Sequence, residues 1–432
     1  MRNQRSMHIL FLLFAALTGC TVAVIIWVFL KVCNLGVAVV WDYFPTYVDS
    51  PLYTMILCLF GGLIIGIFHK KYGDFPETIQ QVIHRLKTEK RLTYKNIPIV
   101  MAATFLSLFF GGAVGPETGV VGVLAGLCFW AMDQLYMARD TMEELLRKKP
   151  GISGFHLFRF MAAGLLLDPQ RCGFQKSTIW TKNEGILAAV SAVISGFILY
   201  ELLNFFFGRC INIPHLDGGA VDKLDVLFLL ILIAVGIFAG YLFMVFKKIT
   251  TFFFGNLAKK GLTIINALLG GLALGLIGSF IPMTMFSGGN EIQIMQYEYL
   301  QYTPVLLIII GVIKLLLTNI CIQSGWKGGH FFPVIFSGLS IGYGMAILLD
   351  CNQILSVIVV CGALLGTITQ QPLGALAISL LFFPVKDLGW IIVASFIGGC
   401  IPMPKPLRVD PNNRGFIYNI SRGELRKKLP LR

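Results

Sequence analysis

Long apolar stretches alternate with short polar segments along almost the whole of this 432-residue chain. A helix needs about 20 apolar residues to cross the roughly 30 Å hydrocarbon core of a bilayer. The pattern predicts apolar helices near 8–30, 52–68, 97–112, 120–132, 185–207, 226–246, 262–282, 303–322, 334–349, 354–367, 373–383 and 389–401. Several are too short to cross alone and are interrupted by Gly or Pro, which is typical of broken or re-entrant helices.

The composition agrees with an all-α protein that crosses a membrane several times. Hydrophobic residues make up 56% of the chain and charged residues only 13%, whereas soluble domains carry about 25% charged residues. The net charge of +13 comes from loops beside the apolar runs, so membrane topology explains it and no nucleic-acid partner is expected. The ten cysteines are scattered singly, so neither a disulfide framework, a metal site nor a cofactor is expected.

The charges of the loops predict the orientation of the chain. The 69–96 loop carries seven Lys or Arg residues, whereas 32–51 has Asp42 and Asp49 and no basic residue. Cytoplasmic loops are enriched in Lys and Arg, so the first loop is predicted inside and the second outside. The slightly acidic 208–225 connection is predicted outside. We therefore expect a multi-pass protein of the cell (plasma) membrane with cytoplasmic N- and C-termini.

The same charges predict two halves of opposite topology, because the first half begins inside and the second begins outside. The interval from Gly73 to Gly115 nearly equals the interval from Gly289 to Gly329, which is the kind of matched spacing that a repeat produces. The predicted segments are a first half at 1–207, an extracellular connection at 208–225, a second half at 226–404 and a short basic cytoplasmic tail at 405–432.

Two glycine-rich turns each interrupt an apolar stretch and begin a further apolar helix. They read V-G-P-E-T-G at 114–119 and G-W-K-G-G-H-F-F-P at 325–333. The free N–H groups at a helix start carry partial positive charge and bind anions. Two helix starts at the depth of the bilayer therefore predict an anion pathway.

Glu117 is the most informative single residue of the sequence. A carboxylate inside an apolar run costs several kcal/mol unless it is paired, protonated or facing water, so it indicates function. The structural alternative is a carboxylate that backbone N–H groups satisfy at a helix start, which is compatible with the functional role. A carboxylate that lies on an anion site and leaves when protonated would compete with the anion, so we predict Glu117 as a gate.

Backbone groups of three turns are predicted to bind the anion. The alternative for the turn at 328–333 is packing between two helices. The ring of His330 is not expected to take part, and Asp74 is also predicted as an N-cap with Pro76 in the first helical turn. The candidate anion-binding residues are Gly73, Asp74, Phe75, Gly115, Pro116, Gly329, His330 and Phe331.

Lys314 lies in the middle of the apolar run 303–322. A buried ammonium at such a position pairs with a carbonyl or a carboxylate, or it raises the positive potential near a pore. The sequence favours neither alternative.

An enzyme is the alternative from another functional class. The G-D pair at 73–74 is similar to that of intramembrane aspartyl proteases, and G-I-S-G at 151–154 is similar to the serine motif of rhomboid proteases. The first chemistry needs a second aspartate inside a span, and the second motif follows three basic residues in a polar loop. The other predicted spans contain no such aspartate, and the G-I-S-G serine does not lie in a span, so no enzymatic activity is expected.

Several motifs resemble the CLC family of chloride channels and proton-coupled anion exchangers. V-I-K-L-L-L-T-N-I-C-I-Q-S-G-W-K-G-G-H-F-F-P at 312–333 looks like the helix leading into the family's G-x-F-x-P anion motif, with Gly329, Phe331 and Pro333 matching. V-G-P-E-T-G looks like the turn that carries the family's gating glutamate. Y-G-D-F-P at 72–76 and C-G-A-L-L-G-T-I-T-Q-Q-P-L-G-A at 361–375 are similar to two further family segments.

The resemblance covers about 52–407 and implies the family's fold: helical inverted-topology repeats with broken and re-entrant helices, a homodimer, and one anion pathway in each subunit. The chain would be a divergent prokaryotic-type member without C-terminal regulatory domains. It also implies chloride or another small anion as the partner, the lipid bilayer as the surroundings, and protons as an open second partner.

The sequence also departs from the family pattern. Gly73 occupies the position where chloride-selective members have a serine, and 155–184 is too polar to align with the helix that carries the exchangers' internal glutamate. Glu184 is the only glutamate nearby. The inner-pore tyrosine has two candidates, Arg408 by position and Tyr418 further along the chain. These departures weaken the prediction of proton coupling and the prediction of a preference for chloride. They do not weaken the prediction of the fold.

The sequence therefore predicts transmembrane anion transport, with chloride the default ion, through a pathway gated by a glutamate and either channel-like or weakly coupled to protons. The alternative is a proton-coupled antiporter of chloride or another small anion, and the distant alternative is an intramembrane enzyme.

Overall fold

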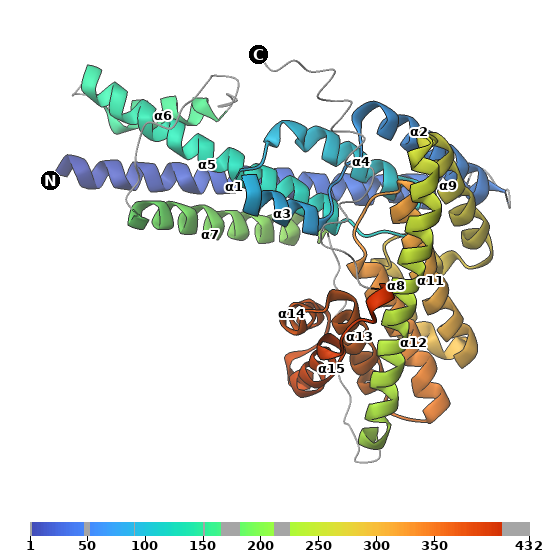
Figure 1. The fold of residues 1–432 in the computed structure, drawn as a ribbon. Coiled ribbons are helices and arrows are strands. Elements are labelled where there is room, and N and C mark those ends of the chain that lie inside the picture. Colours follow the sequence, from blue (N-terminus) through green and yellow to red (C-terminus); the bar gives the residue numbers. More distant parts are fainter. Residues whose placement is uncertain are drawn as a thin grey trace. The chain divides into compact units, whose positions relative to one another are not determined.

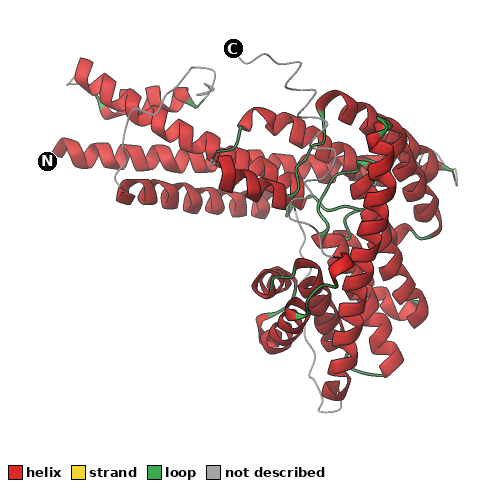
Figure 2. Cartoon of the chain, viewed as in Figure 1, coloured by secondary structure: helices red, strands yellow, loops and turns green. Residues whose placement is uncertain are grey.

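The computed structural model describes residues 2–46, 52–89, 91–149, 152–165, 182–210 and 225–407. Their longer regular elements are all α-helices (Figure 2). The helices are α1 (Arg2–Ala38), α2 (Tyr53–Tyr72), α3 (Ile79–Glu89), α4 (Ile97–Phe109), α5 (Glu117–Lys148), α6 (Gly154–Gly164), α7 (Lys182–Phe207), α8 (Leu229–Lys259), α9 (Thr263–Phe280), α10 (Gly289–Glu298), α11 (Pro304–Ser324), α12 (Phe331–Leu349), α13 (Gln353–Thr369), α14 (Pro372–Phe382) and α15 (Leu388–Cys400). Their order along the chain can be followed in Figure 1.

Every apolar run predicted from the sequence overlaps one of these helices. Eight helical segments among the described residues are long and apolar enough to cross a membrane: His8–Tyr43, Tyr53–Tyr72, Glu117–Lys148, Gly185–Phe207, Leu229–Lys259, Thr263–Phe280, Pro304–Ser324 and Phe331–Leu349. Shorter apolar helices are found at Tyr94–Phe109, Gln353–Thr369 and Pro372–Phe382. The mixture of full-length and short apolar helices confirms the prediction from the hydrophobic pattern.

The described part of 135–184 contains more helix than its polar composition indicates. Helix α5 continues to Lys148, well beyond the apolar run that begins it. Two ion pairs between residues four apart, Arg139 with Glu143 at 3.1 Å and Lys148 with Glu144 at 2.5 Å, join neighbouring turns of this extension. Helix α6 follows, and the hydroxyl of Ser153 caps it by accepting from the N–H of His156.

The described chain forms two compact units. The first consists of 1–34, 79–101 and 120–210. Its buried side chains come from α1, α5, α6 and α7 and include Phe14, Met142 and Met161. Helices α1 and α7 can approach closely because Gly19 has no side chain: a Cβ at this position would overlap the Ala192 carbonyl. The Ser195 hydroxyl of α7 also donates to the Ala16 carbonyl of α1 at 2.9 Å.

The second unit consists of 35–78, 102–119 and 211–432 and contains the candidate site. Helix α2 packs against α9, and α13 packs against α8, α12, α14 and α15. Glycines permit several of these contacts: a Cβ at Gly62 would meet the Ala267 carbonyl, and one at Gly236 would meet the Val360 carbonyl. The segment boundaries predicted at 207 and 226 stay a prediction.

Large apolar side chains remain exposed on the helices that could cross a membrane. Phe205 on α7 is 81% exposed, Leu230 on α8 is 75% exposed and Phe280 on α9 is 80% exposed. Exposed large apolar side chains of this kind are favoured in contact with hydrocarbon and are costly in water.

Candidate anion site

The two glycine turns predicted from the sequence are joined by backbone hydrogen bonds. The N–H of Gly115 donates to the Gly329 carbonyl at 2.8 Å, and the N–H of Gly329 donates to the Gly115 carbonyl at 2.7 Å. Among the described residues, this pair forms an isolated antiparallel β-bridge that belongs to no strand. It holds the starts of α5 and α12 together.

The carboxylate of Glu117 lies at the start of α12. Glu117 is the first residue of α5, and its Oε1 accepts from the N–H of Phe332 at 3.0 Å. His330 is the N-cap of α12, and its side chain makes no capping hydrogen bond, so the carboxylate takes the place of a cap. The free N–H groups of a helix start favour a negative charge at this position. The carboxylate therefore occupies a position suited to a small anion.

The second oxygen of this carboxylate is buried and has no hydrogen-bond partner in the structure. A buried oxygen without a partner costs about 1–3 kcal/mol. The hydrogen-bonding capacity of the carboxylate is therefore only partly satisfied.

Glycines are required beneath the carboxylate. A Cβ placed on Gly115 or on Gly329 would overlap the carboxylate atoms of Glu117. A Cβ on Gly328 would overlap the Val114 side chain, so this neighbouring glycine permits the two turns to meet. The glycine pattern that singled out both turns in the sequence thus makes room for the carboxylate.

The turn at 72–76 uses most of its polar groups within the protein. The N–H of Gly73, whose φ is +92°, donates to the His69 carbonyl at 2.9 Å, and the N–H of Phe75 donates to the Gly73 carbonyl at 3.1 Å. Asp74 forms an ion pair with Lys327 at 3.0 Å. Because α3 begins only at Ile79, the prediction that Asp74 caps this helix was wrong. A role of this turn in anion binding stays a prediction.

The other candidates differ in what they offer an anion. Pro116 has no N–H and cannot donate, although it belongs to the turn. The ring of His330 lies 4.7 Å from the Phe331 ring and 5.8 Å from the Phe243 ring, between centroids, so it packs among aromatic groups. The predictions for Arg408 and Tyr418 lie outside the described residues.

Lys314 follows the first of the two alternatives raised by the sequence. Its fully buried ammonium donates to the carbonyl of Met285 and, at 2.8 Å, to that of Phe286. The Nζ also lies 5.2 Å from the centroid of the Phe336 ring. Both carbonyls precede Gly288, whose φ is +96° and which caps α10, so the lysine stabilises the turn that starts this helix.

Three residues of the site were not predicted from the sequence. Phe332 supplies the N–H that holds Glu117, Lys327 pairs with Asp74, and His69 contacts carbonyls of both Gly73 and Gly325. The position of Phe332 one residue inside a helix start was the available signal, because such N–H groups lack partners within the helix. No sequence pattern shows which side chains join two distant turns.

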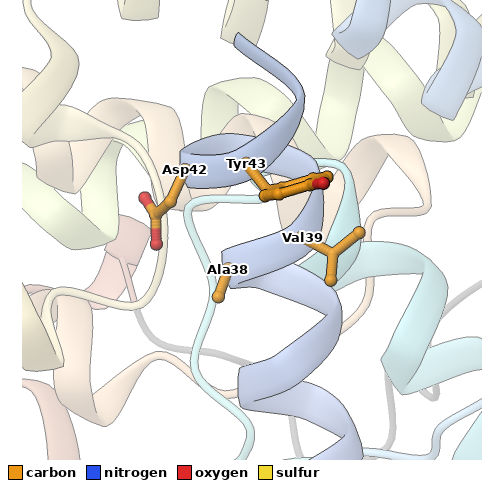
Figure 3. Close-up of a pocket in the computed structure, with 4 residues that line it drawn as sticks. All are labelled: Ala38, Val39, Asp42 and Tyr43. Atoms are coloured by element: carbon orange, nitrogen blue, oxygen red, sulfur yellow. The ribbon is translucent and has the colours of Figure 1, made fainter. Parts of the chain in front are cut away.

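A shallow groove at the end of the first membrane-crossing segment carries no comparable chemistry. Figure 3 shows that Ala38, Val39, Asp42 and Tyr43 all project from consecutive turns of one helical segment. Trp41 of the same segment packs elsewhere: its indole N–H donates to the Phe109 carbonyl at 2.8 Å. One carboxylate on an open surface does not make a binding site.

Comparison with known proteins identifies the family and the fold of this chain. A model of the family described as "Voltage gated chloride channel" matches residues 177–401, which is just over half of the chain. Proteins named "Putative ion-transport protein YfeO" in Escherichia fergusonii and Shigella flexneri are each 23% identical to it. These two matches cover 76% of this chain and 77% of each relative.

Solved structures show the same fold. A slow cyanobacterial Cl−/H+ antiporter superimposes with a TM-score of 0.64 at 18% identity, over 97% of this chain and 99% of that one. A CLC-type fluoride/proton antiporter gives a TM-score of 0.61 at 19% identity, over 92% and 97%. The chain therefore has the all-α membrane fold of inverted-topology repeats with broken and re-entrant helices, as the sequence predicted.

Proposed function

We propose, from the premise that this chain belongs to the voltage-gated chloride channel (CLC) family, that it carries small anions across a membrane and that Glu117 gates their passage. One observation carries the proposal: the Glu117 carboxylate accepts from the N–H of Phe332 at the start of α12, where an anion would bind. Chloride is the default ion, and the protein works as a transporter or channel and not as an enzyme.

The gate would work by competition. An ionised Glu117 satisfies the N–H groups at the start of α12 and excludes the anion from them. Protonation removes the charge that holds the carboxylate there, and the side chain leaves, so a chloride ion takes over the same N–H groups. Partial charges of backbone groups attract the anion without a fixed full charge that would trap it.

The coupling to protons is proposed to be weak or absent. The polar segment 155–184, much of which lies outside the described residues, contains Glu184 as its only glutamate. The alternative of a proton-coupled antiporter is favoured by the descriptions of two solved relatives, a Cl−/H+ and a fluoride/proton antiporter. Their identities of 18% and 19% to this chain support the fold and leave the transport mode open to experiment.

Flux through purified protein in liposomes tests this function. With chloride, fluoride and larger anions compared in turn, we expect chloride to cross. A chloride gradient should drive little uphill proton movement, because the segment 155–184 is too polar to align with the helix that carries the exchangers' internal glutamate. Proton pumping at a fixed ratio to chloride would contradict the passive mode and direct the search to Glu184. Absence of flux for every anion would contradict the function itself, with protein-free liposomes as the control.

The orientation is proposed from the loop charges, with both termini in the cytoplasm of a cell whose plasma membrane holds the protein. Single cysteines at positions 217, 88 and 427 in a background without exposed cysteines test it. A membrane-impermeant thiol reagent should label position 217 from outside and positions 88 and 427 only after the membrane is opened, because positive loops stay inside. Labelling of 217 and 88 from the same side would contradict the predicted halves.

The family resemblance further leads us to propose a homodimer.

A further inference from the structure

An ion pair joins the turn that follows α2 to the turn that precedes α12. The Asp74 carboxylate lies 3.0 Å from the Lys327 ammonium, and the two side chains are 24% and 13% exposed. The same turns also meet at His69 in the last turn of α2, whose ring nitrogens lie 2.8 Å from the Gly73 carbonyl oxygen and 2.7 Å from that of Gly325. The two turns therefore lie directly against each other.

Lys327 is close to the candidate anion site. It precedes Gly329 by two residues, and a Cβ at Gly329 would overlap the Glu117 carboxylate. Two residues of backbone span at most about 7 Å, so the backbone of Lys327 lies within about 11 Å of that carboxylate. No other Lys, Arg, Asp or Glu occurs between residues 315 and 349. A residue with a full positive charge thus lies next to a site whose backbone groups offer only partial charges.

Stability alone does not account for a charge pair at this place. Taking two charges out of water costs about as much as their attraction returns, and apolar residues often replace a buried pair without loss of stability. The chain also has other links here, since the Gly115–Gly329 bridge already fixes the start of α12. The effect of the pair on the electrostatic potential of the site is therefore the more informative property.

The pair keeps that potential close to the value set by the backbone. At an effective dielectric constant of about 20, a unit charge about 11 Å from an anion changes its affinity about tenfold. A lone Lys327 would strengthen anion binding and a lone Asp74 would weaken it, whereas the two charges at 3.0 Å largely cancel. Transport needs this balance, because an ion must bind well enough to enter a site and weakly enough to leave it.

We propose that Asp74 neutralises Lys327 and that this pair sets how tightly the site at the start of α12 holds its anion. Without Asp74, the lysine would trap the anion; without Lys327, the aspartate would repel it. Both side chains act through the potential and do not touch the ion, so they are positioning residues in the electrostatic sense. This inference rests on the proposed anion transport, because it concerns the affinity of the same site.

Chloride binding to the purified full-length protein in detergent, measured by isothermal titration calorimetry, tests the pair. The parent is Glu117→Gln, because an ionised Glu117 would respond to the same potential as chloride and hide part of the change. Added to this parent, Asp74→Asn should bind chloride about tenfold more tightly and Lys327→Gln about tenfold more weakly. Asp74→Asn and Lys327→Gln together, which remove both charges, should return the affinity to within about threefold of the parent.

Chloride flux in liposomes gives a second measurement on the same variants. Asp74→Asn should lower the chloride concentration at half-maximal flux and also lower the maximal rate, because an ion that binds more tightly leaves more slowly. Lys327→Gln should raise the concentration at half-maximal flux. A loss of packing has no reason to move these two quantities in opposite directions in the two variants.

Asp350→Asn and Lys260→Gln are the matched controls, since each removes the same charge at an exposed position. Asp350 is the C-cap of α12, about 28 Å from the start of that helix, and asparagine suits its left-handed backbone. Lys260 is the C-cap of α8, about 25 Å along the helix from Phe243, whose ring contacts that of His330. Chloride affinity should stay within about twofold, because charges at such distances are screened.

The outcomes separate the pair from the proposed function. Equal-sign shifts in Asp74→Asn and Lys327→Gln would overturn the inference, because a link that only holds the turns together gives that result. Unchanged affinity in both variants, or no chloride binding in either the parent or Asp74→Asn, would also overturn it. Flux in the wild type would leave anion transport standing in all these cases. Shifts of opposite sign without flux of any anion in the wild type would overturn transport and retain the role of the pair.

Discussion

Anion flux through the Glu117→Gln variant is expected to lose most of its dependence on pH. Glutamine has the shape of the protonated side chain and carries no charge, so it should compete poorly for the N–H of Phe332. A site that a competing group occupies about 99% of the time has an apparent affinity lowered about 100-fold. Apparent anion affinity at neutral pH should therefore rise by about tenfold to 100-fold.

The measurement is chloride flux or binding as a function of pH, with Glu143→Gln as the matched control. Glu143 lies on the same helix, in an ion pair at the surface with Arg139, and has no role in the proposed gate. If Glu117→Gln leaves both flux and its pH profile at the wild-type values, Glu117 is not the gate.

Gly329→Ala is expected to open the same gate by a different route. The nearest atoms to a Cβ at this position all belong to the Glu117 carboxylate, so the methyl group should displace that side chain. Gly329 has no positive φ, so alanine fits the backbone. Gly329→Ala should therefore resemble Glu117→Gln, with a similar increase in apparent anion affinity and a flattened pH profile of the flux.

A double-mutant cycle distinguishes displacement of Glu117 from general damage. In a Glu117→Ala background the carboxylate is absent, so adding Gly329→Ala should change flux little, and the coupling between the two changes should be large. Gly389→Ala serves as the control, because a Cβ there meets nothing within 4 Å. Additive effects of Glu117→Ala and Gly329→Ala would contradict a direct collision.

The sequence predicted the helices well because each depends on its own apolar residues. The run at 303–322 became α11 and the run at 262–282 became α9, each close to its predicted bounds. It predicted less of α5, since ion pairs between neighbouring turns extend that helix through polar sequence.

The candidate site was predicted in part for a similar reason. Glu117 and both glycine turns are visible locally, as a charge or a run of glycines in apolar surroundings. The partners of these groups depend on tertiary structure: Asp74 was interpreted as a helix cap because its neighbours favoured one, and it instead pairs with a lysine distant in sequence. Nothing near Lys327 or His69 in the sequence indicates those contacts.

The bridge between Gly115 and Gly329 also sets the order of events during synthesis. When Glu117 leaves the ribosome, the amide that will hold it has not been made, because Phe332 lies 215 residues further along the chain. A nascent first half therefore lacks both the N–H of Phe332 and the start of α12. If Glu117 is the proposed gate, the gate and the anion site form together when the late chain pairs with the early chain, so the site does not form first and close afterwards.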